Sequence, residues 1–149
     1  MAEEGKGTAE RSGVRPPYGR WAEAEGGRVA LIGCRCRSCG ETLFPERKAC
    51  PSCLGSDLDE KRLEGPATLY NFTVVHQLPA GFPAPMVVGY GKFPEGVIVF
   101  APIDADPKEL KPGVSLALHA GTTKTDEKGE ALVTYRFRQV AGREEGPYA

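Results

Sequence analysis

The segments Cys36-Arg-Ser-Cys39-Gly40 and Cys50-Pro-Ser-Cys53 decide how the first half of the chain folds. Each Cys-x-x-Cys turn places two thiolates on one tight loop, and two facing turns supply the four soft ligands that Zn²⁺ takes in a tetrahedron. Gly40 follows the first pair, where such a turn often needs a positive φ. The pattern predicts a zinc ribbon with Cys36, Cys39, Cys50 and Cys53 as ligands.

Other uses of these cysteines remain open in the sequence. Iron is the rival metal, because four tetrahedral thiolates hold iron as well as zinc. A disulfide is possible too, although Cys-x-x-Cys redox motifs occur singly and not in facing pairs. Four protein sulfurs leave no open position for water or substrate, so the predicted site is structural and not catalytic. Cys34 is expected to be a small buried residue, although it lies close enough in sequence to compete for the metal.

Four cations flank the two turns: Arg35, Arg37, Arg47 and Lys48. Four thiolates on a dication leave two net negative charges, which neighbouring cations reduce. Ordinary solvated side chains are the alternative interpretation of the same four residues.

The composition narrows the class of protein. The chain has 149 residues, a formal net charge of −1 and a pI of about 6.2, so no basic surplus points to a polyanion such as DNA. No apolar run reaches membrane-spanning length, and residues 1–10 lack the apolar core of a signal peptide. We therefore expect a cytoplasmic protein, where thiols stay reduced and paired cysteines bind metals. The 19 Gly and 13 Pro favour short strands and turns.

The chain divides into four expected parts. Residues 1–33 are an N-terminal arm and lead-in strand, 34–60 the zinc ribbon, 61–140 a β-barrel and 141–149 a C-terminal tail. Within the arm, Tyr18 and Trp21 are candidate anchors to the body or to a partner. A short helical turn is expected over 21–25 and a strand over 28–32.

Five strands are expected after the ribbon, over 67–76, 86–93, 97–103, 114–120 and 130–140. In the first, Tyr70, Phe72 and Val74 alternate inward, and glycines in the second indicate a bulge or bend. The third is almost wholly apolar, which predicts burial on both faces. The last two are expected to place Val114, Leu116, Leu118, Val133, Tyr135 and Phe137 inward, and His119, Thr134, Arg136 and Arg138 outward. Five bent strands joined by turns predict a closed OB-type barrel.

The order of these motifs resembles a known family. A Trp-containing lead-in, the two cysteine turns, Phe44-Pro45, 65–68 (Gly-Pro-Ala-Thr) and 72–76 (Phe-Thr-Val-Val-His) follow one another. The chain resembles, over residues 21–140, the small acyl-CoA-associated proteins that join a rubredoxin-like zinc ribbon to an OB-fold. The resemblance implies a mostly β fold and a non-catalytic accessory subunit of a thiolase-like enzyme. It also implies an acyl-CoA substrate for the complex, aromatic or steroid-derived in several relatives.

The residues themselves support three functional hypotheses. An accessory subunit fits best, because no nucleophile–base pair is evident: the cysteines bind metal, and His76 and His119 stand on separate strands. In that role, Arg35, Arg37, Arg47 and Lys48 would meet the phosphates of coenzyme A at the partner interface, and the 78–86 loop would form a rigid apolar lip. A module that binds single-stranded nucleic acid is the alternative, although inward Tyr70 and Phe72 suit a core better. An iron-holding electron carrier is the third.

Overall fold

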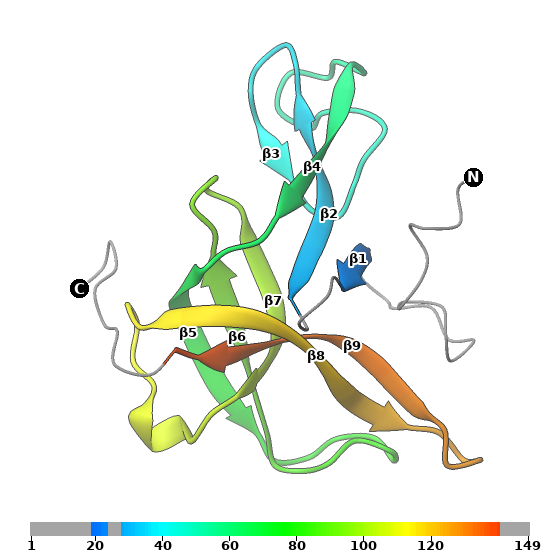
Figure 1. The fold of residues 1–149 in the computed structure, drawn as a ribbon, viewed down its shortest axis with the longest axis vertical. Helices are drawn as coiled ribbons and strands as arrows, with labels where there is room; N and C mark the ends of the chain where they lie inside the picture. Colours follow the sequence, from blue (N-terminus) through cyan, green and yellow to red (C-terminus); the bar gives the residue numbers. More distant parts are fainter. Residues whose placement is uncertain (1–18, 24–27, 141–149) are drawn as a thin grey trace.

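The computed structural model describes residues 19–23 and 28–140, and these residues form two β units (Figure 1). The first is a small sheet that carries the cysteine turns at its far end, and the second is a closed barrel. The elements are β1 (Arg20–Glu23), β2 (Val29–Cys36), β3 (Thr42–Leu43), β4 (Leu58–Leu63), β5 (Ala67–Val75), β6 (Met86–Lys92), β7 (Ile98–Asp104), the 3-10 turn η4 (Pro107–Glu109), β8 (Ser115–Thr125) and β9 (Ala131–Gln139). The described residues contain no helix that is long and apolar enough to span a membrane.

The ribbon sheet is built around β2. β1 and β3 pair with successive parts of one of its edges, and β4 pairs antiparallel with the other. The expected helical turn over 21–25 is wrong: residues 20–23 form a strand in which Trp21 pairs with Leu31. The strand expected at 28–32 continues to Cys36, because the antiparallel partners extend that far. β4 crosses the expected boundary between residues 60 and 61, so the domain limits stay a prediction.

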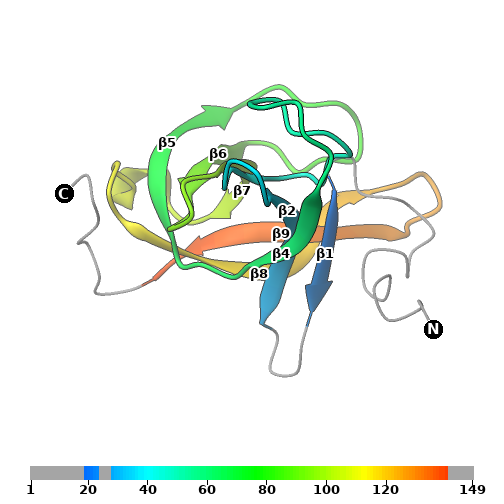
Figure 2. The same cartoon turned by 90° about the horizontal axis from the view of Figure 1, so that it is seen from above.

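The barrel closes in the order β5-β6-β7-β9-β8, as Figure 2 shows from above. All neighbours are antiparallel except β7 and β9, which meet in parallel at Ile103↔Phe137 and Asp104↔Arg138. The mostly β fold with a five-stranded OB-type barrel is therefore confirmed. The 3-10 turn η4 follows β7, and Asp106 caps it by accepting from the backbone N–H of Lys108.

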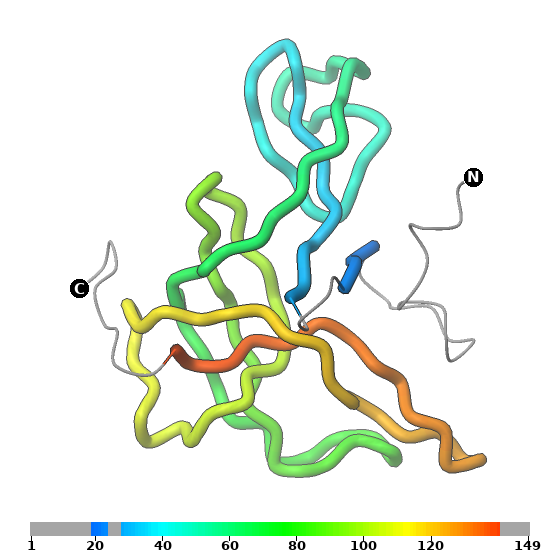
Figure 3. Tube along the Cα trace, in the orientation of Figure 1, coloured from blue at the N-terminus to red at the C-terminus, as the bar shows by residue number. Residues whose placement is uncertain are grey.

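One hydrophobic core joins the two units. Trp21, Leu31 and Leu63 from the ribbon sheet are fully buried and belong to the same cluster as the barrel residues Leu69 and Phe137. The chain passes from β4 directly into β5, and Figure 3 follows this path between the units. Trp21 thus anchors its strand to the body, as expected, whereas Tyr18 and the 141–149 tail lie outside the described residues.

Glycines let the strands of the barrel approach closely. A Cβ at Gly89 would stand 2.5 Å from the carbonyl oxygen of Asn71, and one at Gly91 would stand 2.7 Å from the ring of Phe137. The register shift lies on the facing strand, between Leu69 and Asn71, and not on β6 itself. The glycines therefore provide space, while β5 carries the bulge.

Two expectations about inward faces are wrong. Val99, Ala101 and Ile103 are buried on β7, but Ile98 and Phe100 between them are exposed, so this strand is buried on one face only. Its outward apolar residues are therefore not core residues. On β5, the bulge after Leu69 breaks the alternation, so that Tyr70 is exposed, while Phe72 packs partly against the core.

The last two strands follow the expected alternation with one exception. The six inward positions pack in or against the core, namely Val114, Leu116, Leu118, Val133, Tyr135 and Phe137. Thr134 and Arg136 were expected outward but are buried, whereas Arg138 is exposed. The exception arises because polar partners cover the outer side of β9 at these positions.

Candidate functional site: a four-cysteine metal centre

Two similar turns bring the cysteines together. In the first, the backbone N–H of Gly40 donates to the carbonyl of Cys36 at 2.9 Å, and in the second Leu54 donates to Cys50 at 2.7 Å. The fifth residue of each turn has a positive φ, 83° at Gly40 and 68° at Leu54. The first turn thus places glycine where the left-handed conformation is needed, whereas the second places a leucine there.

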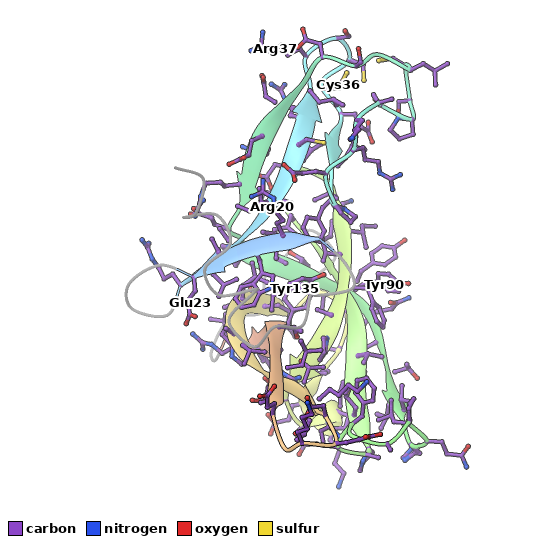
Figure 4. All side chains as sticks on the ribbon, turned by 90° about the vertical axis from the view of Figure 1, so that its right-hand side faces the viewer. Arg20, Glu23, Cys36, Arg37, Tyr90 and Tyr135 are labelled. Carbon is purple, nitrogen blue, oxygen red and sulfur yellow. The ribbon has the colours of Figure 1, made fainter. Side chains whose placement is uncertain are left out.

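The four sulfurs form a compact cluster at the far end of the ribbon, where Figure 4 labels Cys36. Cys36 Sγ lies 3.5 Å from Cys53 Sγ, Cys39 Sγ lies 3.6 Å from Cys50 Sγ, and all four sulfurs lie within 4.8 Å of one another. A tetrahedral zinc with Zn–S bonds of about 2.3 Å separates its sulfurs by about 3.8 Å. The cluster therefore has the donor set and the size for one such metal ion, with no ligand position left over.

The ionisation of these thiols also calls for a cation. Backbone donation from Cys39 lowers the pKa of Cys36 to about 7. The backbone N–H of Glu41 lowers the pKa of Cys39 too, but the neighbouring sulfurs, Cys50 first, raise it to about 12. Four thiolates this close repel one another, and a bound cation is what allows all four to lose their protons.

Cys34 lies outside the cluster. Its side chain is buried on β2, and its sulfur accepts the backbone N–H of Arg47 at 3.4 Å. This contact holds the start of the segment that leads to the second turn. Cys34 is thus a buried residue, as expected, with a hydrogen bond in place of a metal.

The four predicted cations take different places on the ribbon. Arg37 donates to Asp59 at 2.8 Å and lies 3.8 Å from Asp57, which raises the pKa of its guanidinium. Arg35, Arg47 and Lys48 are exposed. The structure does not bring these cations to one point, and their contact with coenzyme A stays a prediction.

A groove of about 450 Å³ separates the ribbon from the barrel. Its ribbon wall includes Leu43, Phe44 and Arg47, and its barrel wall is the β6–β7 turn, residues 95–98. Sequence reasoning missed this groove, because no local pattern indicates which strand of the barrel faces β3.

A partly buried polar cluster on the barrel was also missed. Arg136 donates to both carboxylate oxygens of Asp104, at 2.9 and 2.6 Å, and to Thr123 at 2.8 Å. Thr123 and Thr134 are 2.5 Å apart, and His119 Nε2 lies 2.7 Å from Asp104. Desolvation raises the pKa of Asp104, but the hydrogen bonds and charge of Arg136 outweigh it and hold that pKa below its usual value. Local sequence could not single out Arg136, because it alternates with the core residues of β9 in the same way as the exposed Arg138.

Comparisons with known proteins agree with this architecture. Residues 24–59 match the family described as "ChsH2, rubredoxin-like zinc ribbon domain", and residues 60–120 match "ChsH2, C-terminal OB-fold domain". The chain is 32% identical over 119 residues to the benzoylsuccinyl-CoA thiolase subunit BbsA of Thauera aromatica, covering 80% of this chain and 83% of that protein. It is 31% identical over 118 residues to a DUF35 domain-containing scaffold protein of Methanocaldococcus jannaschii, covering 76% of this chain and 84% of the relative.

A solved structure shares the fold. The chain titled "Ltp2-ChsH2(DUF35) aldolase" superposes with a TM-score of 0.60 at 25% identity, covering 73% of this chain and 84% of that one. The resemblance inferred from the motifs is thereby confirmed. The chain belongs to the ChsH2 (DUF35) family of proteins that join a rubredoxin-like zinc ribbon to a C-terminal OB-fold.

Proposed function

We propose that this protein is a non-catalytic, zinc-binding accessory subunit of a thiolase-like enzyme that acts on an acyl-CoA. The observation that carries the proposal is the match over 80% of the chain to a protein named as a thiolase subunit. The likeness to a chain of an aldolase of ChsH2 type supports it. We further propose an aromatic or steroid-derived acyl group and a cytoplasmic location.

The absence of a catalytic group among residues 19–23 and 28–140 supports a non-catalytic role. Four of the five cysteines gather in the metal cluster, and the fifth is buried. His76 lies just beyond the end of β5, while His119 faces an Asp104 carboxylate that Arg136 already neutralises. This arrangement provides no nucleophile next to a free base, so the partner supplies the chemistry.

Zinc held by Cys36, Cys39, Cys50 and Cys53 would give the ribbon its fixed shape. The ribbon has little core of its own beyond the residues shared with the barrel, so ligand bonds replace apolar burial at its far end. In this role the metal supplies no chemistry, because four protein sulfurs complete its coordination.

The experiment that tests the proposal is co-purification of the tagged full chain from its host, followed by reconstitution. We expect a thiolase-like protein in near-equal amount, and acyl-CoA cleavage only when both chains are present. The proposal would be contradicted if the chain were recovered alone. It would also be contradicted if the partner cleaved acyl-CoA equally well without the chain.

We propose that coenzyme A phosphates are met by Arg35, Arg37, Arg47 and Lys48 in the assembled complex. The test is the double substitution of Arg37 and Arg47 by alanine. The control also removes two positive charges, by substitution of the exposed Lys108 and Lys128 outside the ribbon. A CoA affinity about tenfold weaker in the first variant alone supports the role. Equal affinities in both variants remove it.

Binding of single-stranded nucleic acid is the second candidate. The exposed rings of Tyr70, Tyr90 and Phe100 favour it, because OB-folds stack bases on aromatic side chains. The net charge of −1 opposes it. A gel-shift titration with single-stranded DNA at low salt decides, and the absence of a shift at micromolar protein excludes this function.

A further inference from the structure

We propose that the outer face of β6 and β7 is the surface on which the thiolase-like subunit docks, an inference that rests on the proposed function. The face is defined by Tyr90 of β6 and by Ile98 and Phe100 of β7, and is called the aromatic face below. These side chains are 41, 40 and 39% exposed.

The aromatic face is a continuous feature and not a set of isolated residues. Tyr90 pairs with Phe100 across the two strands, and their ring centroids lie 5.2 Å apart. Ile98 stands two residues before Phe100 on the same side of β7. Tyr90 projects away from the barrel in Figure 4. Tyr70, on the neighbouring strand, adds a further ring that is 46% exposed.

The opposite face of the same strands already forms the core. Val99, Ala101 and Ile103 are buried inside the barrel, so the outward residues are not needed for its packing. Tyr90, Ile98 and Phe100 stay exposed in the part of the chain that the structure describes, so no described element covers this face. A cluster of large apolar side chains that serves neither the core nor a visible cover is typical of an interaction surface.

The aromatic face continues into the groove between ribbon and barrel. Ile98 lines both, and beyond it lie Val97 and the ribbon residues Leu43 and Phe44. Charged side chains line the groove as well, namely Glu41, Arg47 and Glu95. Protein interfaces combine apolar and aromatic residues with polar ones in this way. A partner seated here would contact both units at once.

The charges select a protein as the occupant. A nucleic acid would require several cations beside the rings, but the groove offers Arg47 together with two acidic residues, Glu41 and Glu95. Lys61 is already paired with Glu95 at 3.6 Å. The three defining residues are uncharged, and aromatic residues are enriched at the centres of protein interfaces. Since relatives of this chain are named as subunits, the thiolase-like protein is the partner to which we assign the face.

The test is the affinity of full-length, zinc-loaded variants for the thiolase-like subunit recovered with the wild-type chain. We expect Phe100→Glu to raise the dissociation constant at least tenfold, because it places a charge at the centre of the aromatic face. Phe100→Leu, which keeps an apolar side chain there, should retain most of the binding. Tyr90→Ser is a second variant should Phe100→Glu unfold. Leu54→Glu is the control, since Leu54 is 80% exposed at the far end of the ribbon.

Each outcome has a distinct meaning. The docking face is wrong if Phe100→Glu and Tyr90→Ser both fold and bind within twofold of the wild-type affinity. It is also wrong if only Leu54→Glu loses binding. A wild-type chain that recovers no thiolase-like protein refutes the proposed function instead. If sedimentation shows a homodimer that Phe100→Glu dissociates, or if DNA binding is lost in that variant, the face serves a second copy or nucleic acid and the proposal is wrong.

Discussion

Phe44 of the ribbon packs edge-on against Tyr135 of the barrel, with ring centroids 5.9 Å apart and planes at 78°. Tyr135 is buried on β9, whereas Phe44 follows the two-residue strand β3 and is partly buried against the shared core. This contact ties the ribbon to the barrel at a point remote in sequence from the covalent link between β4 and β5. Together with the shared core, it helps to set the position of the metal cluster relative to the barrel.

We expect Phe44→Ala to lower the free energy of unfolding by about 1–3 kcal/mol, because it removes an aromatic pair and leaves a partly filled gap. The measurement is urea unfolding followed by the fluorescence of Trp21, which lies in the same core. Phe82→Ala is the control, because Phe82 is also partly buried but contacts Lys124 in the loop region. Equal losses in both variants would argue against a special role for the Phe44 contact.

Metal content separates the roles of the cysteines. Cys39→Ser is expected to lose the zinc and the fixed structure of the ribbon, because three thiolates bind the ion far more weakly than four. Cys34→Ser is expected to keep about one zinc per chain, since its sulfur contacts the backbone of Arg47 and lies outside the metal cluster. Elemental analysis of both purified variants provides the answer. A colourless wild-type protein with zinc and no iron is the companion expectation, and zinc lost from both variants would place Cys34 in the site.

Leu54 offers an unusual stabilising substitution. It adopts a φ of 68° that leucine tolerates poorly, while its side chain is almost fully exposed. We expect Leu54→Gly to raise the free energy of unfolding of the zinc-loaded chain by about 0.5–1 kcal/mol. Gly40→Leu, at the same place in the first turn, should lower it by a similar amount. Thermal unfolding of the two variants checks the pair, and a destabilised Leu54→Gly would show that the leucine makes a contact needed by the turn.

Asp104 links stability to pH. Its pKa is held below the usual 3.8 by Arg136 despite desolvation, so its ionised form stabilises the fold above about pH 4. This contribution is lost as the pH falls through the lower pKa of the folded state. We expect Asp104→Asn to cost about 1–3 kcal/mol at pH 7, a figure reduced because the carboxylate is 41% exposed. The cost should shrink as the pH falls below about 4.

Urea unfolding at pH 7 and pH 3 tests this prediction, with the exposed Glu127→Gln as a control for loss of one carboxylate. Asp104 contacts both Arg136 and His119, so its substitution removes both contacts at once. An Asp104→Asn cost that does not change between the two values would contradict the assignment.

Because β5, β6 and β7 approach one another closely at Gly89, a methyl group added there should lower the stability of the barrel. Gly89→Ala should destabilise by about 1–3 kcal/mol, because its Cβ would stand 2.5 Å from a backbone oxygen that cannot move away. Gly96→Ala is the comparison: nothing lies within 4 Å there, and only its positive φ opposes the change. Equal thermal shifts of the two variants would show that crowding at Gly89 is relieved by the strands.

The metal centre and the barrel were the parts that local sequence could predict. Two Cys-x-x-Cys turns carry their own geometry, and the alternation in 114–120 and 130–140 reports which side of a strand meets the core. The predictions failed where the same local pattern is compatible with two different structures. Residues 20–23 form a strand because Trp21 pairs with β2, and the bulge after Leu69 turned Tyr70 outward.

By itself, the sequence determined the ligands brought together by the cysteine turns, the number of barrel strands and most of their inward residues, because short-range spacing sets these properties. Only the tertiary structure decided which side chains face the core, the solvent or one another. It exposed Ile98 and Phe100 on a strand whose sequence predicts burial on both faces. It also buried Arg136 against Asp104 and placed the ring of Phe44 against that of Tyr135. An apolar side chain meets the core or the solvent according to the side of the barrel on which it falls, and closure of the barrel sets that side.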